Sequence, residues 1–200
     1  MNLSIPLKQR KHWIFDMDGT LTVSAHDFDH MRERLGLAPQ TPILEALTAM
    51  PEAEAKPLWN LLNELEFHYA GMASIMSGAI DLLSHLEQNG RQLAILTRNT
   101  MPVVEQTLKA CGIERFFPLE QRLDRDSCQP KPSPDGINRL LHYWQADAED
   151  TVMVGDYLYD LEAGRGAGVA TVHLDTGRGM DWSDYTDVRV ESLHEIMAYL

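Results

Sequence analysis

The sequence predicts an α/β fold with a parallel sheet core and a small α-helical cap inserted after the first strand. Short apolar segments alternate with helical patterns along most of the 200 residues, which is typical of a parallel sheet. Residues 22–76 break this alternation and are longer than one crossover between strands needs. We therefore expect a core domain of residues 1–21 and 77–200 and a helical cap of residues 22–76, although ordinary crossover helices are the alternative.

The expected strands are short apolar runs. They lie at His12–Asp16, Gln92–Thr97, Thr151–Gly155 and Val169–His173, with a weaker candidate at Asp187–Val190. Runs of this length without alternation indicate strands that are buried on both faces.

The helices between these strands have recognisable starts and stops. Apolar residues recur at helical spacing within Gly78–Gln88. Thr100 can cap a helix over Met101–Cys111. A third helix is expected to start after Ser133, where proline and an acidic residue follow in the first turn, and to run to about Trp144.

The insert carries a helical pattern of its own. Its apolar residues with helical spacing are Leu58, Leu61, Leu62, Leu65 and Tyr69, and its prolines are Pro39, Pro42, Pro51 and Pro57. We find no convincing strand in this segment. A helical insert directly after the first strand is expected to act as a lid over the residues that follow that strand.

Composition argues against several classes of partner. The formal net charge of −13 disfavours nucleic acid and anionic membranes, which attract basic surfaces. The N-terminus has no signal-peptide pattern and no apolar run reaches membrane length, so a cytoplasmic location is expected. Cys111 and Cys128 match neither a C-x-x-C motif nor a zinc spacing, and two free thiols in a reducing cytoplasm are the simplest account.

The segment Asp16-Met17-Asp18-Gly19-Thr20 follows the first predicted strand. Two carboxylates at the end of a buried strand are costly unless they are paired or bind a metal. A glycine at this point allows a sharp turn. The pattern suits a nucleophilic carboxylate beside a second carboxyl group that moves protons. The alternative is a simple Asp-Gly turn after the strand.

Two further polar segments follow later parts of the core. Thr97, with Arg98 and Asn99 after it, ends a strand, and its hydroxyl can donate to a phosphoryl oxygen, although threonine is also common in strands. Lys131 stands between prolines that restrict the backbone and so fix the direction of its side chain. The alternative for Lys131 is a solvated surface charge.

A third segment contains a second pair of carboxylates. Asp156 follows the strand Thr151–Gly155, and Asp160 lies one helical turn later if a helix begins near Tyr157. Carboxylates at a strand end are ligands that Mg²⁺ accepts. The alternative is that Asp156 caps the helix and Asp160 is an acid of its first turn.

Taken together, the order D-x-D-G-T, Thr, Lys, G-D-x-x-x-D resembles the haloacid dehalogenase (HAD) superfamily over about residues 12–175. The helical insert after the first motif is similar to the cap of the phosphoglycolate phosphatase-like and β-phosphoglucomutase-like subgroup, although it is short for that group. The resemblance implies a Rossmann-like parallel sheet with the cap inserted after its first strand.

The resemblance also implies roles for individual residues. Asp16 would be the nucleophile that forms an aspartyl-phosphate, and Asp18 would be the general acid and base. The catalytic residues would be Asp16, Asp18, Thr97 and Lys131, the substrate-binding residues Thr20, Arg98 and Asn99, and the Mg²⁺ residues Asp16, Asp18 (through its main-chain carbonyl), Asp156 and Asp160. Thr20 would hydrogen-bond near Asp16, and Asp160 would support the metal's waters or orient Lys131.

The expected activity is that of a Mg²⁺-dependent phosphatase for a small phosphorylated metabolite, acting as a monomer or homodimer. A phosphomutase of the β-phosphoglucomutase type and a non-enzymatic phosphate-binding module are the alternatives, whereas Asp18 disfavours a dehalogenase. Residues of the insert that could set specificity are His26, His30, Arg32, Arg34, His68 and Tyr69.

Overall fold

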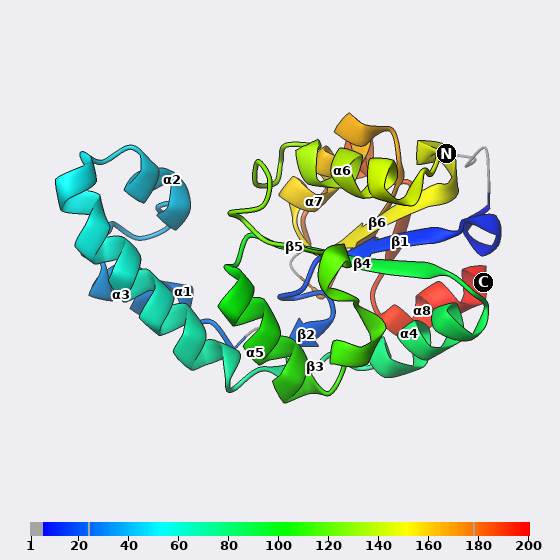
Figure 1. Ribbon diagram of the computed structural model, residues 1–200, viewed down its shortest axis with the longest axis horizontal. Coiled ribbons are helices and arrows are strands. Elements are labelled where there is room, and N and C mark those ends of the chain that lie inside the picture. Colours follow the sequence, from blue (N-terminus) through cyan, green and yellow to red (C-terminus); the bar gives the residue numbers. More distant parts are fainter. Residues whose placement is uncertain (1–5, 24, 178) are drawn as a thin grey trace.

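The computed structural model describes residues 6–23, 25–177 and 179–200. A six-stranded sheet in the order β5-β4-β1-β6-β7-β8, with all pairs parallel, forms the centre of the molecule (Figure 1). Its strands are β1 (His12–Phe15), β4 (Gln92–Leu96), β5 (Arg122–Leu123), β6 (Thr151–Gly155), β7 (Ala170–Leu174) and β8 (Val188–Val190). The predicted parallel α/β fold is confirmed.

Strand β1 lies in the middle of the sheet and determines where the polar segments meet. Phe15 is in register with Ile95 of β4 and with Val154 of β6. The backbone N–H of Asp16 continues the ladder by donating to the carbonyl of Val154 at 2.9 Å. The residues that follow β1, β4 and β6 therefore emerge side by side at the carboxyl edge of the sheet, where open α/β sheets bind ligands.

Helices cover both faces of the sheet. One face carries α4 (Ala79–Gln88), α5 (Met101–Cys111) and α8 (Leu193–Ile196), and the other carries α6 (Asp135–Trp144) and α7 (Leu158–Ala167) (Figure 1). Alternate residues of β1 face opposite sides, as the period of a strand requires. Trp13 and Phe15 belong to the core with α4 and α5, whereas Ile14 packs with α6 and α7. Short 3-10 turns lie at Leu7–Gln9, Glu114–Phe116, Leu119–Gln121, Ala148–Asp150, Ser183–Tyr185 and Met197–Tyr199.

The predicted strands and helices occur within one or two residues of their expected ends. The edge strand β5 was not predicted, because two half-buried residues carry no apolar pattern. The capping prediction for α5 is wrong. Thr100 makes no side-chain cap, and the N–H of Met101 instead donates to Asp124 Oδ2 at 2.9 Å.

The insert contains α1 (Phe28–Arg34), α2 (Ile43–Thr48) and α3 (Glu52–Ala70), which Figure 1 shows projecting from the sheet. These helices bury a small apolar core of their own around Met31, Leu47 and Leu62. The C-terminal part of α3 packs against α5.

The expectation that this segment has no strand is wrong. β2 (Thr22–Val23) and β3 (Ser74–Ile75) pair in an antiparallel ladder where the chain leaves the core and where it returns. Each strand is only two residues long, so neither produces the alternation that reveals a strand in a sequence.

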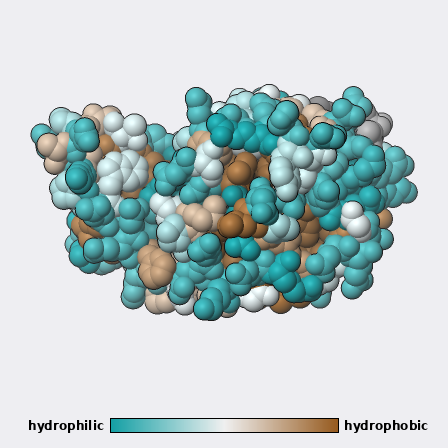
Figure 2. Space-filling view, viewed as in Figure 1, coloured by the Kyte–Doolittle hydropathy of each residue, from teal (hydrophilic) through white to brown (hydrophobic). Residues whose placement is uncertain are grey.

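Hydrophilic residues cover most of the face in Figure 2, and apolar residues are exposed mainly near its centre. Within the described ranges, no helix is both long and apolar enough to span a bilayer.

Candidate active site

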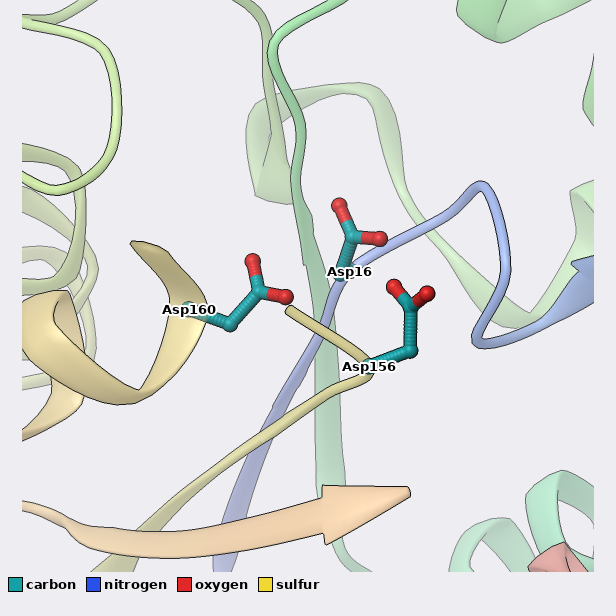
Figure 3. Close-up of side chains that lie close together, drawn as sticks. All are labelled: Asp16, Asp156 and Asp160. Atoms are coloured by element: carbon teal, nitrogen blue, oxygen red, sulfur yellow. The ribbon is translucent and has the colours of Figure 1, made fainter. Parts of the chain in front are cut away.

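Three buried carboxylates meet at the carboxyl edge of the sheet. Asp16 follows β1, Asp156 follows β6, and Asp160 lies in the first turn of α7 (Figure 3). One carboxylate oxygen from each lies within 4.8 Å of the others. Asp16 is 8 %, Asp156 5 % and Asp160 2 % exposed. The parallel register of β1 and β6 thus brings together residues that are far apart in the sequence.

Two glycines make room for these carboxylates. Gly19 has φ of +86°, and a Cβ atom there would lie 2.5 Å from Asp156 Oδ2. A Cβ atom on Gly155 would lie 2.2 Å from Cβ of Asp160. Because non-bonded atoms do not approach this closely, a side chain at either position would push an aspartate side chain away. The glycines of the two Asp-containing motifs therefore have a direct structural purpose.

Lys131 supplies a positive charge to the cluster. Its Nζ donates to Asp16 Oδ1 at 2.5 Å and lies 2.6 Å from Asp160 Oδ1. The side chain is 2 % exposed, so the prediction that Lys131 is held in a fixed direction is confirmed and the surface-charge alternative is wrong. The peptide bond between Lys131 and Pro132 is cis.

The other oxygen of Asp160 is also engaged. Oδ2 accepts a hydrogen bond from the N–H of Tyr157 at 3.0 Å, in a capping box at the start of α7. Tyr157 is the residue that precedes the helix, so the alternative in which Asp156 caps it is wrong. Asp160 therefore links the helix start to Lys131.

Burial and charge shift the ionisation of this cluster in opposite directions. Burial raises the pKa of Asp16 well above its usual range, Lys131 opposes the rise, and the charges of Asp160 and Asp156 add to it. Burial also lowers the pKa of Lys131, but Asp16 and Asp160 outweigh it, so the net shift is upward. We conclude that Lys131 is charged and that three carboxyl groups surround this one ammonium.

This charge balance fits a divalent cation. With all three carboxyl groups ionised, one ammonium leaves two negative charges in excess, which one dication would compensate. Carboxylate oxygens are the donors that Mg²⁺ prefers. The buried aspartates can therefore bind a metal ion, and Asp16 and Asp156 offer oxygens toward the same point (Figure 3).

Asp18 lies beside this cluster but is held by other residues. Its Oδ2 accepts a hydrogen bond from Asn99 Nδ2 at 2.5 Å, and its Oδ1 accepts one from Thr22 Oγ1 at 3.4 Å. The ring nitrogen Nδ1 of His26 lies 3.6 Å from the same Oδ1. The carboxyl group is thereby fixed by residues from β2, the loop after β4 and the start of the insert.

Thr97 and Arg98, which follow β4, make contacts with different parts of the molecule. Thr97 is buried, and its Oγ1 accepts from the backbone N–H and from the side-chain amide of Asn99 at 3.2 and 3.3 Å. Arg98 points instead toward the insert, where it contacts Glu45 of α2 at 2.5 Å, and its guanidinium lies 4.9 Å from the ring centre of Tyr159.

The expectation for the Thr20 hydroxyl is not met. Thr20 is fully buried, and among the described residues its Oγ1 has no hydrogen-bond partner. Only its backbone N–H stabilises the loop, by donating to the carbonyl of Met17 at 3.3 Å.

Comparison with known proteins decides the family. A family model described as haloacid dehalogenase-like hydrolase matches residues 13–174. The chain belongs to the haloacid dehalogenase-like hydrolases. It is 32% identical to a hydrolase from Saccharomyces cerevisiae over 96% of this chain and 91% of the relative. It is 26% identical to the pyrophosphatase PpaX from Listeria monocytogenes over 79% of this chain and 80% of that protein.

The fold of this HAD-like hydrolase is also similar to solved structures. One is a predicted phosphoglycolate phosphatase from Haemophilus somnus, with a TM-score of 0.77, 21% identity, and coverage of 95% of this chain and 97% of that chain. At this identity the likeness concerns the fold.

The insert of this HAD-like hydrolase brings only some of its predicted specificity residues near the site. His26 contacts Asp18 and lies 5.7 Å from Tyr69, measured between ring centres. Arg32 instead pairs with Asp29 within α1 and donates to the carbonyl of Thr41. Arg34 and His68 are exposed, and His30 is partly exposed.

Sequence reasoning missed a further contact between the core and the insert. Arg125 lies between β5 and the Lys131 segment, and its Nη1 donates to Glu66 Oε1 of α3 at 3.0 Å. Neither residue belongs to a motif, and the two are 59 positions apart. No local signal in the sequence predicts this pair.

Proposed function

We propose that this HAD-like hydrolase is a Mg²⁺-dependent phosphatase that hydrolyses a small phosphomonoester through an aspartyl-phosphate. The observation that carries the proposal is the buried Lys131 ammonium between Asp16 and Asp160, with Asp156 beside them. This arrangement offers one carboxylate nucleophile among charges that suit a transferred phosphoryl group. The names of similar proteins, a pyrophosphatase and a predicted phosphoglycolate phosphatase, support phosphoryl chemistry.

In the first step, a carboxylate oxygen of Asp16 attacks phosphorus, and the bond from phosphorus to the leaving-group oxygen breaks. Asp18 donates its proton to that oxygen, which leaves as an alcohol. Lys131 and Thr97 stabilise the charge on the phosphoryl oxygens, which is the main task in phosphoryl transfer. Asp160 keeps Lys131 in position through their 2.6 Å contact.

In the second step, Asp18 is a carboxylate and accepts a proton from water. The water oxygen attacks phosphorus, and the bond between phosphorus and Asp16 breaks. Inorganic phosphate leaves, and Asp18 is protonated again. Splitting one displacement into two in this way lowers the barrier of each.

The metal would be held by Asp16, the main-chain carbonyl of Asp18, and Asp156. When bound, Mg²⁺ supplies positive charge that lets an anionic nucleophile approach an anionic phosphate. In the same proposal residues 22–76 act as the cap, and Arg98, Asn99 and Thr20 lie on the substrate side.

The decisive experiment measures release of inorganic phosphate from p-nitrophenyl phosphate. We expect steady release by the wild type with Mg²⁺ and none with excess EDTA. The variant Asp16→Asn should lose at least about a thousandfold in kcat, since the nucleophile is removed. Retained turnover by this variant would exclude the covalent mechanism. If the wild type instead stays phosphorylated until a sugar phosphate is added, the protein is a phosphomutase.

A further inference from the structure

Two arginines of the core reach carboxylates of the insert. Arg98 contacts Glu45 of α2 at 2.5 Å, and Arg125 donates to Glu66 of α3 at 3.0 Å. The two pairs differ in burial. The Glu45 side chain is 48% exposed, whereas the Arg125 and Glu66 side chains are 7% and 9% exposed. The Arg125 guanidinium also donates to Asn63 at 2.7 Å, so it is firmly held against α3.

The buried pair is connected to Asp18. The backbone N–H of Arg125 donates to the carbonyl of Asn99 at 3.0 Å, and the side chain of Asn99 holds the Asp18 carboxyl at 2.5 Å. Glu66 is thus linked to the proposed general acid through two residues of the core.

A second connection reaches Asp18 from the same helix. The His26 ring lies 3.6 Å from Asp18 Oδ1 and 5.7 Å, between ring centres, from Tyr69. Glu66 and Tyr69 are three positions apart on α3 and therefore lie on the same face of the helix. This face of α3 is consequently turned toward the side of the site where Asp18 would meet the leaving group.

Glu66 has a carboxylate oxygen without a hydrogen-bond partner. Oε1 accepts from Arg125, but Oε2 is buried and has no hydrogen-bond partner among the described residues. The residue is 7% exposed. Burial raises the pKa of Glu66, Arg125 opposes the rise, and the charge of Asp18 adds to it. A buried carboxylate oxygen without a donor is costly, so a donor supplied by a ligand would be stabilising.

The same geometry disfavours a second negative charge on the substrate. Both arginines that reach the insert within the described chain, Arg98 and Arg125, already contact its carboxylates. A carboxylate or second phosphate on the leaving group would therefore meet Glu66 without an unpaired guanidinium to bind it. Like charges in a partly buried site repel strongly.

We propose that Glu66 is a specificity-determining residue whose Oε2 accepts a hydrogen bond from a hydroxyl or ammonium group of the leaving alcohol. The preferred substrates are then phosphomonoesters of polyols, sugars or amino alcohols, rather than those with a second anionic group. This inference rests on the proposed phosphatase function. It separates this protein from relatives whose names refer to pyrophosphate or phosphoglycolate.

The test compares two substrates of nearly the same shape. 2-Hydroxyethyl phosphate and phosphoglycolate differ only in a hydroxymethyl group against a carboxylate. We expect the wild type to favour 2-hydroxyethyl phosphate in kcat/KM by about tenfold or more, which is the scale of one hydrogen bond to a charged group. Ethyl phosphate, which lacks the hydroxyl donor, should be used less well than 2-hydroxyethyl phosphate by a similar factor.

Two variants of Glu66 should change this preference in a defined way. Glu66→Gln keeps an acceptor for Arg125 but presents an amide instead of a charge. The ratio of kcat/KM for 2-hydroxyethyl phosphate to kcat/KM for phosphoglycolate should therefore fall by about tenfold. Glu66→Ala leaves Arg125 without its carboxylate partner, so kcat/KM for phosphoglycolate should rise further. Hydrolysis of p-nitrophenyl phosphate by each variant establishes that it folds.

Glu87→Gln is the matched control, because it also removes a carboxylate that contacts an arginine, Arg115, but at an exposed position that belongs to no proposed site. It should keep the wild-type ratio. The inference is overturned if the wild type prefers phosphoglycolate, if active Glu66 variants keep the wild-type ratio, or if Glu87→Gln changes the ratio equally. If the wild type hydrolyses none of the three esters and no aryl phosphate, the proposed function itself fails, and this inference with it.

Discussion

The side-chain amide of Asn99 donates a hydrogen bond of 2.5 Å to Oδ2 of Asp18. These residues follow different strands and are 81 positions apart, yet the parallel sheet places them in contact. Asn99 is itself held, because Thr97 Oγ1 accepts from both its backbone N–H and its side chain. The orientation of the proposed general acid thus depends on the loop after β4.

Replacing Asn99 by alanine should therefore lower kcat more than it changes KM. Without the amide, the Asp18 carboxyl loses its closest partner and is positioned less well for proton transfer. We expect kcat for p-nitrophenyl phosphate to fall by about tenfold to a hundredfold, within the range that general acid–base catalysis contributes.

Asn89→Ala is the control for this experiment. The Asn89 amide donates to the carbonyl of His85 at 2.8 Å on the surface of α4. Asn89→Ala therefore also loses a side-chain hydrogen bond, but at a residue that does not contact the site. If Asn99→Ala has the same kcat as Asn89→Ala, Asn99 does not position the acid.

Gly19→Ala should weaken Mg²⁺ binding and activity. The new Cβ atom would lie 2.5 Å from Asp156 Oδ2, so the carboxylate must move away from Asp16. The φ of +86° adds a backbone cost of about 1–2 kcal/mol for a residue with a side chain. Calorimetric titration with Mg²⁺ and urea unfolding would measure the two effects separately.

Gly90→Ala separates the cost of backbone strain from the effect of displacing the Asp156 carboxylate. Gly90 has φ of +67°, but a Cβ atom there meets nothing within 4 Å. This variant should lose a similar free energy of unfolding while keeping wild-type Mg²⁺ affinity. Equal Mg²⁺ affinity in Gly19→Ala would contradict the close approach of Gly19 to Asp156.

Asp124→Ala should destabilise the start of α5. Asp124 Oδ2 accepts from the N–H of Met101 at 2.9 Å, and its Oδ1 accepts from the N–H of Ser127 at 2.9 Å. Loss of a capping carboxylate costs about 1 kcal/mol, and loss of the Ser127 contact adds to it. Thr100→Ala should cost less in urea unfolding, because Thr100 makes no side-chain cap. A larger cost for Thr100→Ala would reverse this assignment.

The capping of α5 also illustrates how far sequence can predict this protein. The main strands and the polar segments that follow them were predictable, since each depends on a local pattern and parallel strands bring their carboxyl ends together. The cap from Asp124 comes from 23 positions away, and the pair Arg125–Glu66 joins two segments without a motif. Such contacts depend on how the insert packs on the core, which no local pattern records.

Mg²⁺ should stabilise the protein increasingly as pH rises. Burial raises the pKa of Asp16 well above the ordinary value of 3.8, so the folded state binds this proton more tightly than the unfolded state does. The resulting stabilisation is present below the unfolded pKa and is lost as pH rises toward the folded pKa. In EDTA the free energy of unfolding should therefore decline over this window. A bound dication favours the ionised carboxylates, so the gain from Mg²⁺ should be larger at about pH 7.5 than at about pH 5.

Urea unfolding at both pH values, with Mg²⁺ and with EDTA, measures this difference. Asp156→Asn is the informative variant, because it removes one of the charges that raise the pKa of Asp16 and one proposed metal ligand. The free energy of unfolding of this variant in EDTA should decline less as pH rises, and Mg²⁺ should stabilise the variant little. A gain from Mg²⁺ that is the same at both pH values in the wild type, or unchanged in Asp156→Asn, would mean that the ion binds elsewhere.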